Sequence, residues 1–134
     1  MLRNIAALTL AGAAAATKDI CRVLVLSGGG SNGAWEAGVI WGLVNYGNPA
    51  DFEWDVVSGV SAGSINTVAV SGYPIGQEAE MAQWLSDEWK NLKTEDVWVD
   101  WPWGGKTKGL TLEAGIVDNT PLLAYLRGIT DQFT

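Results

Sequence analysis

The most informative absence in this sequence is histidine, which occurs at none of the 134 positions. Histidine is the usual base that takes the proton from a catalytic serine. A serine nucleophile in this chain would therefore need a carboxylate, a lysine or a group from outside these residues as its base. A serine–histidine–aspartate triad within the chain is excluded.

Cysteine and basic residues are also scarce. Cys21 is the single cysteine, so no internal disulfide can form and cysteine usage gives no support for an oxidising compartment. Cys21 begins an apolar run and is predicted to be a small core residue. The chain has 8 lysines and arginines against 15 acidic residues, a formal net charge of −7. This balance argues against nucleic acid as a partner, and the scattered acids are expected to form a solvated surface.

Apolar residues, by contrast, are abundant. The chain is 48% hydrophobic with 17 glycines and 8 tryptophans, which is enough apolar material for the core of one globular domain. At the N-terminus, Arg3 precedes an apolar stretch from Ile5 to Ala16 that ends in small residues. This order predicts a signal peptide over residues 1–16 and a location outside the cell or in the endomembrane lumen. The alternative is an alanine-rich helix of a mature cytoplasmic protein.

Hydrophobic periodicity predicts alternating strands and helices. Residues 21–26 and 54–59 are expected to be strands, the first of them buried, and residues 33–46 and 62–71 the helices that follow. Residues 76–92 predict an amphipathic helix and residues 118–129 a last helix, whereas 96–109 is expected to be irregular with a short strand at 97–99. The expected apolar stripe of the first helix is Val39, Leu43 and Tyr46, and that of residues 76–92 is Met81, Trp84, Leu85, Trp89 and Leu92.

This alternation indicates an α/β fold with a mainly parallel sheet. Two or three strands are too few for such a sheet, so the sequence is expected to be the first part of a larger domain. Neither an internal repeat nor a linker interrupts it.

A glycine-rich loop, Gly28-Gly29-Gly30-Ser31-Asn32-Gly33, joins the first expected strand to its helix. The pattern G-x-G-x-x-G there is typical of dinucleotide binding, with Asp51, Glu53 or Asp55 as the ribose-binding acid. The same backbone N–H groups could instead form an oxyanion hole beside a nucleophile. A structural turn is the third interpretation, although four glycines exceed what a turn needs.

A second motif, Gly59-Val60-Ser61-Ala62-Gly63, lies at the next strand-to-helix junction. G-x-S-x-G in this context is a nucleophile elbow, a sharp turn that projects the serine hydroxyl above the sheet edge. The small flanking residues permit that turn. Ser61 is therefore the candidate nucleophile.

Together, "VLVLSGGGSNGAWEAGVIWGL" and "WDVVSGVSAGSIN" resemble the start of a patatin-like phospholipase. The resemblance covers about residues 22–129 and implies a three-layer α/β/α fold and hydrolysis of lipid acyl esters by a serine–aspartate dyad, without metal or organic cofactor. It assigns Ser61 as nucleophile and Gly59 and Gly63 as its flanking glycines. Gly28, Gly29, Gly30 and Gly33 would form the oxyanion hole. The resemblance also accounts for the missing histidine.

The sequence departs from that family's pattern at the base. The family's aspartate lies in an Asp-Gly pair, and no such pair occurs in this chain. Asp118 precedes Pro121 and suits a helix cap, and Asp131 stands in the terminal tail. The base is therefore unassigned and expected beyond residue 134, with residues 17–134 as the N-terminal portion of the domain. A catalytically inactive interaction domain and a dinucleotide-binding module are the alternative functions.

Three tryptophans, Trp98, Trp101 and Trp103, crowd the segment expected to be irregular. Tryptophan favours the membrane–water boundary, which a lipid hydrolase must meet transiently. Asp96 and Asp100 lie among the rings, so packing beneath a long loop is the preferred interpretation.

Overall fold

A computed structural model describes residues 20–48 and 51–133, and the predicted signal peptide lies outside them. Two strands, β1 (Val23–Leu26) and β2 (Val56–Gly59), pair in parallel, with Val23 opposite Val56 and Leu26 opposite Gly59. Each strand runs into a helix, β1 into α1 (Asn32–Tyr46) and β2 into α2 (Ala62–Gly72). The predicted α/β class with parallel strands is confirmed.

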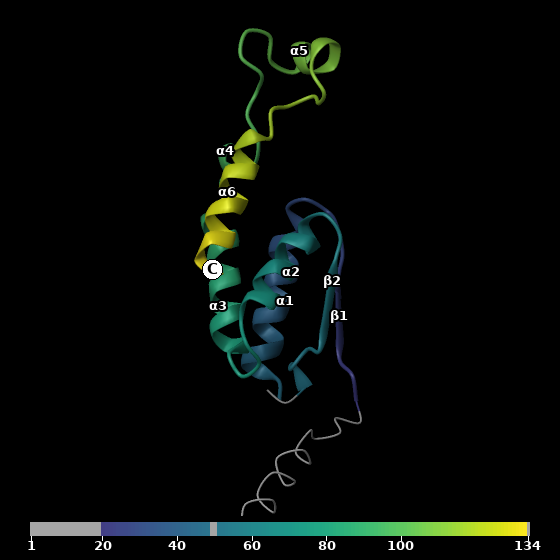
Figure 1. Cartoon of the computed structure of the whole chain (residues 1–134), viewed down its shortest axis with the longest axis vertical. Helices are drawn as coiled ribbons and strands as arrows, with labels where there is room; N and C mark the ends of the chain where they lie inside the picture. The colour runs from purple at the N-terminus through teal and green to yellow at the C-terminus, as the bar shows by residue number, and fades with distance from the viewer. Residues whose placement is uncertain (1–19, 49–50, 134) are drawn as a thin grey trace, which may run out of the picture.

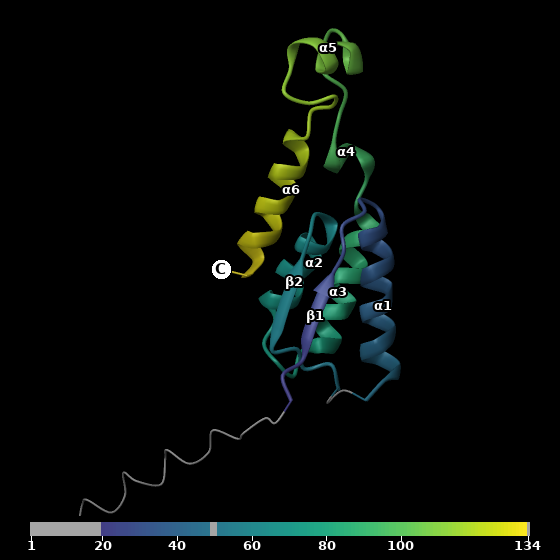
Figure 2. The ribbon, with the colours of Figure 1, turned by 90° about the vertical axis from the view of Figure 1, so that its right-hand side faces the viewer.

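The helices lie on one face of this two-stranded sheet. In Figures 1 and 2, α1, α2 and α3 (Glu78–Asn91) stack against the same side of β1 and β2. Leu24 and Leu26 of β1 face that side and pack in the core. On the other side, the alternate residues Val23 and Val25 are exposed, Val25 by 73%. The prediction of a buried first strand was therefore wrong, and Cys21, expected in the core, is exposed as well.

Helix α1 turns a different stripe inward from the one predicted. Gly33, Ala37, Ile40 and Val44 are buried, whereas Val39, Leu43 and Tyr46 are exposed. Both sets recur at helical spacing, because α1 is apolar on nearly every side. Periodicity alone cannot choose between them, and contact with α2 and α3 decides.

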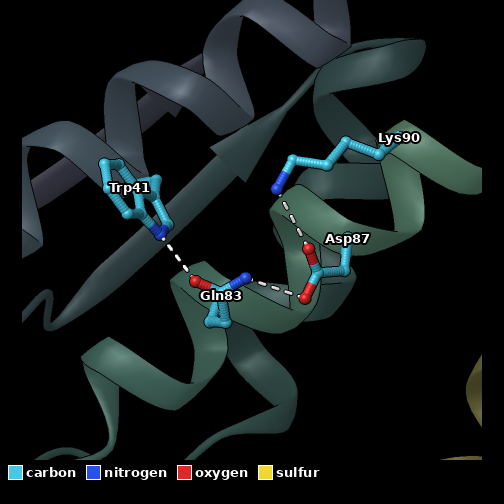
Figure 3. A network of polar contacts seen from close by, with 4 residues as sticks. All are labelled: Trp41, Gln83, Asp87 and Lys90. Carbon is cyan, nitrogen blue, oxygen red and sulfur yellow. Dashed lines mark hydrogen bonds and ion pairs between the residues drawn. The ribbon is translucent and has the colours of Figure 1, made fainter.

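Helix α3 completes the core as its amphipathic pattern predicts. Met81 and Leu85 are buried, with Trp84 and Trp89 packed against the core at its border. On the surface between α1 and α3, Trp41 Nε1 donates to Gln83 Oε1 at 2.9 Å (Figure 3). Gln83 and Lys90 in turn both donate to the Asp87 carboxylate. This chain of polar contacts ties the two helices together outside the core.

A hairpin-like excursion follows α3. The short helix α4 (Thr94–Val97) leads into it, it contains α5 (Gly105–Leu112), and it returns to α6 (Thr120–Thr130) and a final turn, η2 (Asp131–Phe133). Val99 and Asp118 close its base through one antiparallel bridge. The segment expected to be irregular thus holds two short helices, and the expected strand at 97–99 is reduced to that bridge. Figure 1 shows α5 standing away from the packed helices.

Within the residues that the structure describes, no helix is both long and apolar enough to cross a membrane.

Candidate active site

Ser61 occupies a sharp turn between β2 and α2. Its backbone has φ 53° and ψ −121°. Ser61 is one of two non-glycine residues with positive φ in the described part of the chain. This conformation is strained for a residue with a side chain and costs on the order of 1–3 kcal/mol. The strain and the strand-to-helix position are the properties that a nucleophile elbow requires.

The two glycines of the elbow are required by close packing of the backbone. A Cβ on Gly59 would lie 2.2 Å from the carbonyl oxygen of Gly63, and one on Gly63 would lie 2.5 Å from that of Ser27. The turn is also held by Val60 N–H, which donates to Leu26 O at 3.2 Å. Helix α2 can therefore start directly against the carboxyl end of β1 only if both positions lack a side chain.

The glycine-rich loop after β1 lies beside this serine. A Cβ on Gly28 would be 3.2 Å from Ser61 Cβ, tighter than an ordinary contact, so a glycine at this position lets the loop lie close beside the elbow. The carbonyls of Gly29 and Gly30 accept hydrogen bonds from the N–H groups of Asn32 and Gly33, both at 3.1 Å. Within the described part of the chain, the N–H groups of Gly28, Gly29 and Gly30 donate no hydrogen bond. These three N–H groups are available to a charged oxygen, whereas the N–H of Gly33, which was also expected in the oxyanion hole, is bonded to Gly30 O.

An open pocket of about 810 Å³ lies over the serine. This volume is within the range of about 300–1,000 Å³ that is typical of small-molecule sites. Its walls come from the loop, the elbow and helices α1, α2, α3, α4 and α6, and most of the side chains are apolar. The lining comprises Gly30, Ser31, Ala34, Ser61, Ala62, Ser64, Ile65, Trp89, Leu92, Lys93, Thr94, Val97, Trp98, Leu122 and Leu126.

The carboxylates considered from the sequence are not among these lining residues. Asp118 accepts hydrogen bonds from Thr120 Oγ1 at 2.6 Å and Thr120 N–H at 2.9 Å. Those two bonds hold the pKa of Asp118 below its ordinary value and fix the entry to α6. Asp131 lies in η2, beyond the end of α6. Lys93 is the one charged side chain lining the described pocket.

The acids proposed for a dinucleotide lie at the wrong end of the sheet. Asp55 accepts a hydrogen bond from Arg22 N–H, and Asp51 pairs with the Arg22 guanidinium at 3.6 Å. Both contacts lie before the start of the strands, and a four-residue strand is about 13 Å long. The glycine loop follows the strands' other end, where a ribose-binding acid would also have to stand. The geometry does not support dinucleotide binding.

Several site residues were not singled out from the sequence. Leu122 and Leu126 of α6 line the pocket, and their spacing of four residues was a recognisable signal of one helix face. Trp89 was assigned to the core, yet it also forms a pocket wall. Asn66, one turn into α2, is fully buried, and its only signal was a polar residue within an apolar helix.

Comparison with known proteins identifies a family for this chain. A family model described as patatin-like phospholipase matches residues 24–134, which include both the loop and the elbow. No curated protein and no solved structure matches the chain.

Proposed function

The chain belongs to the patatin-like phospholipase family, and on that premise we propose that it is a serine hydrolase of lipid acyl esters. The observation that carries the proposal is the strained Ser61 elbow in contact with a glycine loop whose N–H groups are available. Membership of the family supports lipid hydrolysis in general. The roles of individual residues are inferred from the geometry.

In the proposed reaction, Ser61 Oγ attacks the carbonyl carbon of an acyl ester while a carboxylate base takes the hydroxyl proton. The carbonyl oxygen becomes an oxyanion, and N–H groups of Gly28, Gly29 and Gly30 stabilise it. Each donor of this kind is worth about 3 kcal/mol of barrier. The C–O bond to the alcohol then breaks, the alcohol takes the proton from the base, and water releases the fatty acid by the same steps.

The base is the part of this mechanism that the described residues do not provide at the pocket. We propose an aspartate, paired with Ser61 as a dyad, that lies outside the lining described above. Lys93 lines the pocket, but it is an exposed residue and is not proposed as the base. Asp118 is engaged by Thr120 at the start of α6 and is not proposed for this role.

The apolar walls of the pocket favour an acyl chain as the bound group. Leu92, Val97 and Leu126 offer no hydrogen bond from their side chains, so they suit a hydrocarbon better than a sugar or nucleotide. A long acyl substrate comes from a lipid surface, which the protein would contact transiently. Trp103 on the way into α5 is 100% exposed, and Figure 2 shows the carboxyl ends of the strands facing the same end of the molecule as α5. We propose this end as the one that meets the lipid.

Labelling with a fluorophosphonate tests the proposal. Ser61 Oγ would bond to phosphorus with loss of fluoride, and intact mass followed by peptide mapping would locate the adduct. We expect an adduct on Ser61 that is lost in Ser61→Ala and retained in Ser71→Ala, which changes an exposed serine near the end of the same helix.

The absence of labelling in a folded protein that includes the proposed aspartate would overturn the reactive serine. That result would favour the alternative of an inactive domain that uses this fold for interaction. This alternative is the second candidate because no carboxylate is among the described lining residues.

A further inference from the structure

Asn66 is the one polar side chain buried in the described core, with 0% exposure. A buried amide is costly unless its donors and acceptor are paired. Asn66 Nδ2 donates to Gly33 O and to Glu36 Oε2, both at 3.1 Å, and its Oδ1 accepts from Trp89 Nε1 at 2.7 Å. One side chain on α2 therefore links α1 and α3.

The same network holds both ends of the glycine loop. Gly33, which closes the loop, is bound directly through its carbonyl. Ser27, which opens it, donates its N–H to Glu36 Oε1 at 2.6 Å, and Glu36 is held by Asn66. Asn66 also lies in the helix that begins directly after Ser61. The position of the loop relative to the nucleophile thus depends on this amide.

The third partner, Trp89, connects the network to the pocket. Its ring packs so closely on α1 that a Cβ on Gly33 would lie 2.3 Å from Trp89 Cζ2. The same ring lines the pocket over Ser61. The indole hydrogen bond to Asn66 restrains the orientation of this pocket wall.

We propose that Asn66 is a positioning residue, which holds the glycine loop and the Trp89 wall in register with Ser61. The inference deepens the proposed hydrolase function and rests on it, because the loop must act as the oxyanion hole for this placement to matter. A displacement of about 1 Å between reacting groups can lower a rate by about a hundredfold. Asn66 needs no contact with the substrate to have such an effect.

Only an amide satisfies this set of partners. Two donors are needed toward Gly33 O and Glu36, and one acceptor is needed toward Trp89 Nε1. An aspartate at this position would set a carboxylate against a carbonyl and the Glu36 carboxylate. Burial and the charge of Glu36 would raise the pKa of that new group, and only its protonated form, with its single O–H, could donate to one of these two acceptors. The Asn66→Asp variant is therefore expected to regain order as the pH falls.

The test compares Asn66→Asp with Asn45→Asp in the full chain. Asn45 is a matched control, because it is exposed on α1 and its Nδ2 likewise donates to a backbone carbonyl, that of Trp41. The rate of Ser61 labelling by a fluorophosphonate is expressed as the ratio of variant to wild type at each pH. We expect this ratio to fall about tenfold to a hundredfold for Asn66→Asp at pH 8 and to recover toward pH 5. For Asn45→Asp the ratio should stay near 1 at every pH.

Two NMR signals report the positions of the glycine loop and the Trp89 ring without any reaction at Ser61. The indole N–H of Trp89, assigned from its absence in Trp89→Phe, should shift in Asn66→Asp, and the Ser27 amide should exchange faster. Normal labelling of Asn66→Asp at every pH, despite those shifts, would overturn the inference. If Asn66→Asp is unfolded at pH 8, Trp89→Phe replaces it: slower labelling of that folded variant supports the inference, and an unchanged rate overturns it.

The outcome separates this inference from the proposed function. A wild-type chain that does not label would overturn the reactive serine, and the positioning role would then be decided by the Ser27 amide. Faster exchange of that amide in Asn66→Asp and not in Asn45→Asp supports the role, and equal exchange in both overturns it.

Discussion

Trp89 and Trp103 are the same residue type in two opposite settings. The Trp89 indole N–H is bonded to the buried Asn66 and its ring packs against Gly33. Trp103 is fully exposed, next to a short helix in which Gly109 is the one buried residue. The first region is formed by three helices packed around the elbow, and the second, residues 98–118, is a hairpin closed by the Val99–Asp118 bridge.

The two regions differ in the groups that pack against their tryptophan rings. Around the elbow, α1, α2 and α3 surround side chains from several directions, so a single hydrogen bond can fix an orientation. In the hairpin, Lys106 lies over the Trp98 ring at 5.5 Å and Lys108 over the Trp101 ring at 5.7 Å. Exposed contacts of this kind contribute about 0.5–1 kcal/mol each. Substitutions should therefore have large effects in the elbow region and small ones in the hairpin.

The largest effect is expected at Gly63. In Gly63→Ala the new methyl group would lie 2.5 Å from Ser27 O, which is backbone and cannot swing away. We expect a loss of about 3 kcal/mol in the free energy of unfolding, measured by urea denaturation. The matched control is Gly38→Ala in α1, where a Cβ meets nothing within 4 Å. That variant should be neutral or stabilised by up to about 1 kcal/mol. Equal stability of the two variants would contradict the packing of the elbow on β1.

The next effect compares the two tryptophans directly. Trp89→Phe keeps most of the ring but removes the donor to Asn66 Oδ1, and a buried acceptor left unpaired costs about 1–3 kcal/mol. Trp103→Phe changes an exposed side chain and should stay within about 0.5 kcal/mol of wild type. Thermal unfolding of both variants measures the difference. A larger loss of stability in Trp103→Phe than in Trp89→Phe would contradict the expected difference between the two regions.

A smaller, pH-dependent effect is expected where α6 meets α3. Tyr125 OH donates to Glu88 Oε2 at 2.6 Å, and burial, followed by that hydrogen bond, raises the pKa of Tyr125 above its ordinary value near 10. The neutral phenol is thus favoured in the folded state. Its contribution to the free energy of unfolding is therefore complete below pH 10 and is lost as the pH rises above 10. Tyr125→Phe should cost about 1 kcal/mol at pH 7, with the difference from wild type shrinking above pH 10 in urea titrations. A constant difference across that range would rule out this linkage.

The smallest effect on stability, with a separate effect on binding, is expected for Trp103→Ala. Its unfolding should match wild type, while affinity for phosphatidylcholine vesicles should fall roughly fivefold because about 1 kcal/mol of apolar burial at the lipid is lost. Tyr46→Ala serves as control, since Tyr46 is 83% exposed at the far end of α1. Vesicle sedimentation would measure both. A loss of affinity in Tyr46→Ala equal to that in Trp103→Ala would show that lipid contact is not made through the α5 end.

The sequence by itself determined the local features whose causes are local. The glycines and the small residues around Ser61 predicted the strand–turn–helix junction. The amphipathic pattern of residues 76–92 predicted α3, observed over 78–91, with Met81 and Leu85 inward. The position of Asp118 before Pro121 likewise indicated a role at the helix start, and its carboxylate accepts a hydrogen bond from Thr120 N–H, although the N-cap residue of α6 is Asn119. These features depend on neighbours within a few residues along the chain, which a sequence pattern records.

Only the tertiary structure decided which surfaces met. It selected the Ala37, Ile40 and Val44 face of α1, which periodicity could not distinguish from the opposite face, and it left Val25 uncovered. It also brought Gly33, Asn66 and Trp89 together from three helices, at separations of 33 and 23 residues along the chain. Partners at such separations are selected by packing and by the need to pair a buried amide. Neither requirement produces a periodic pattern in the sequence.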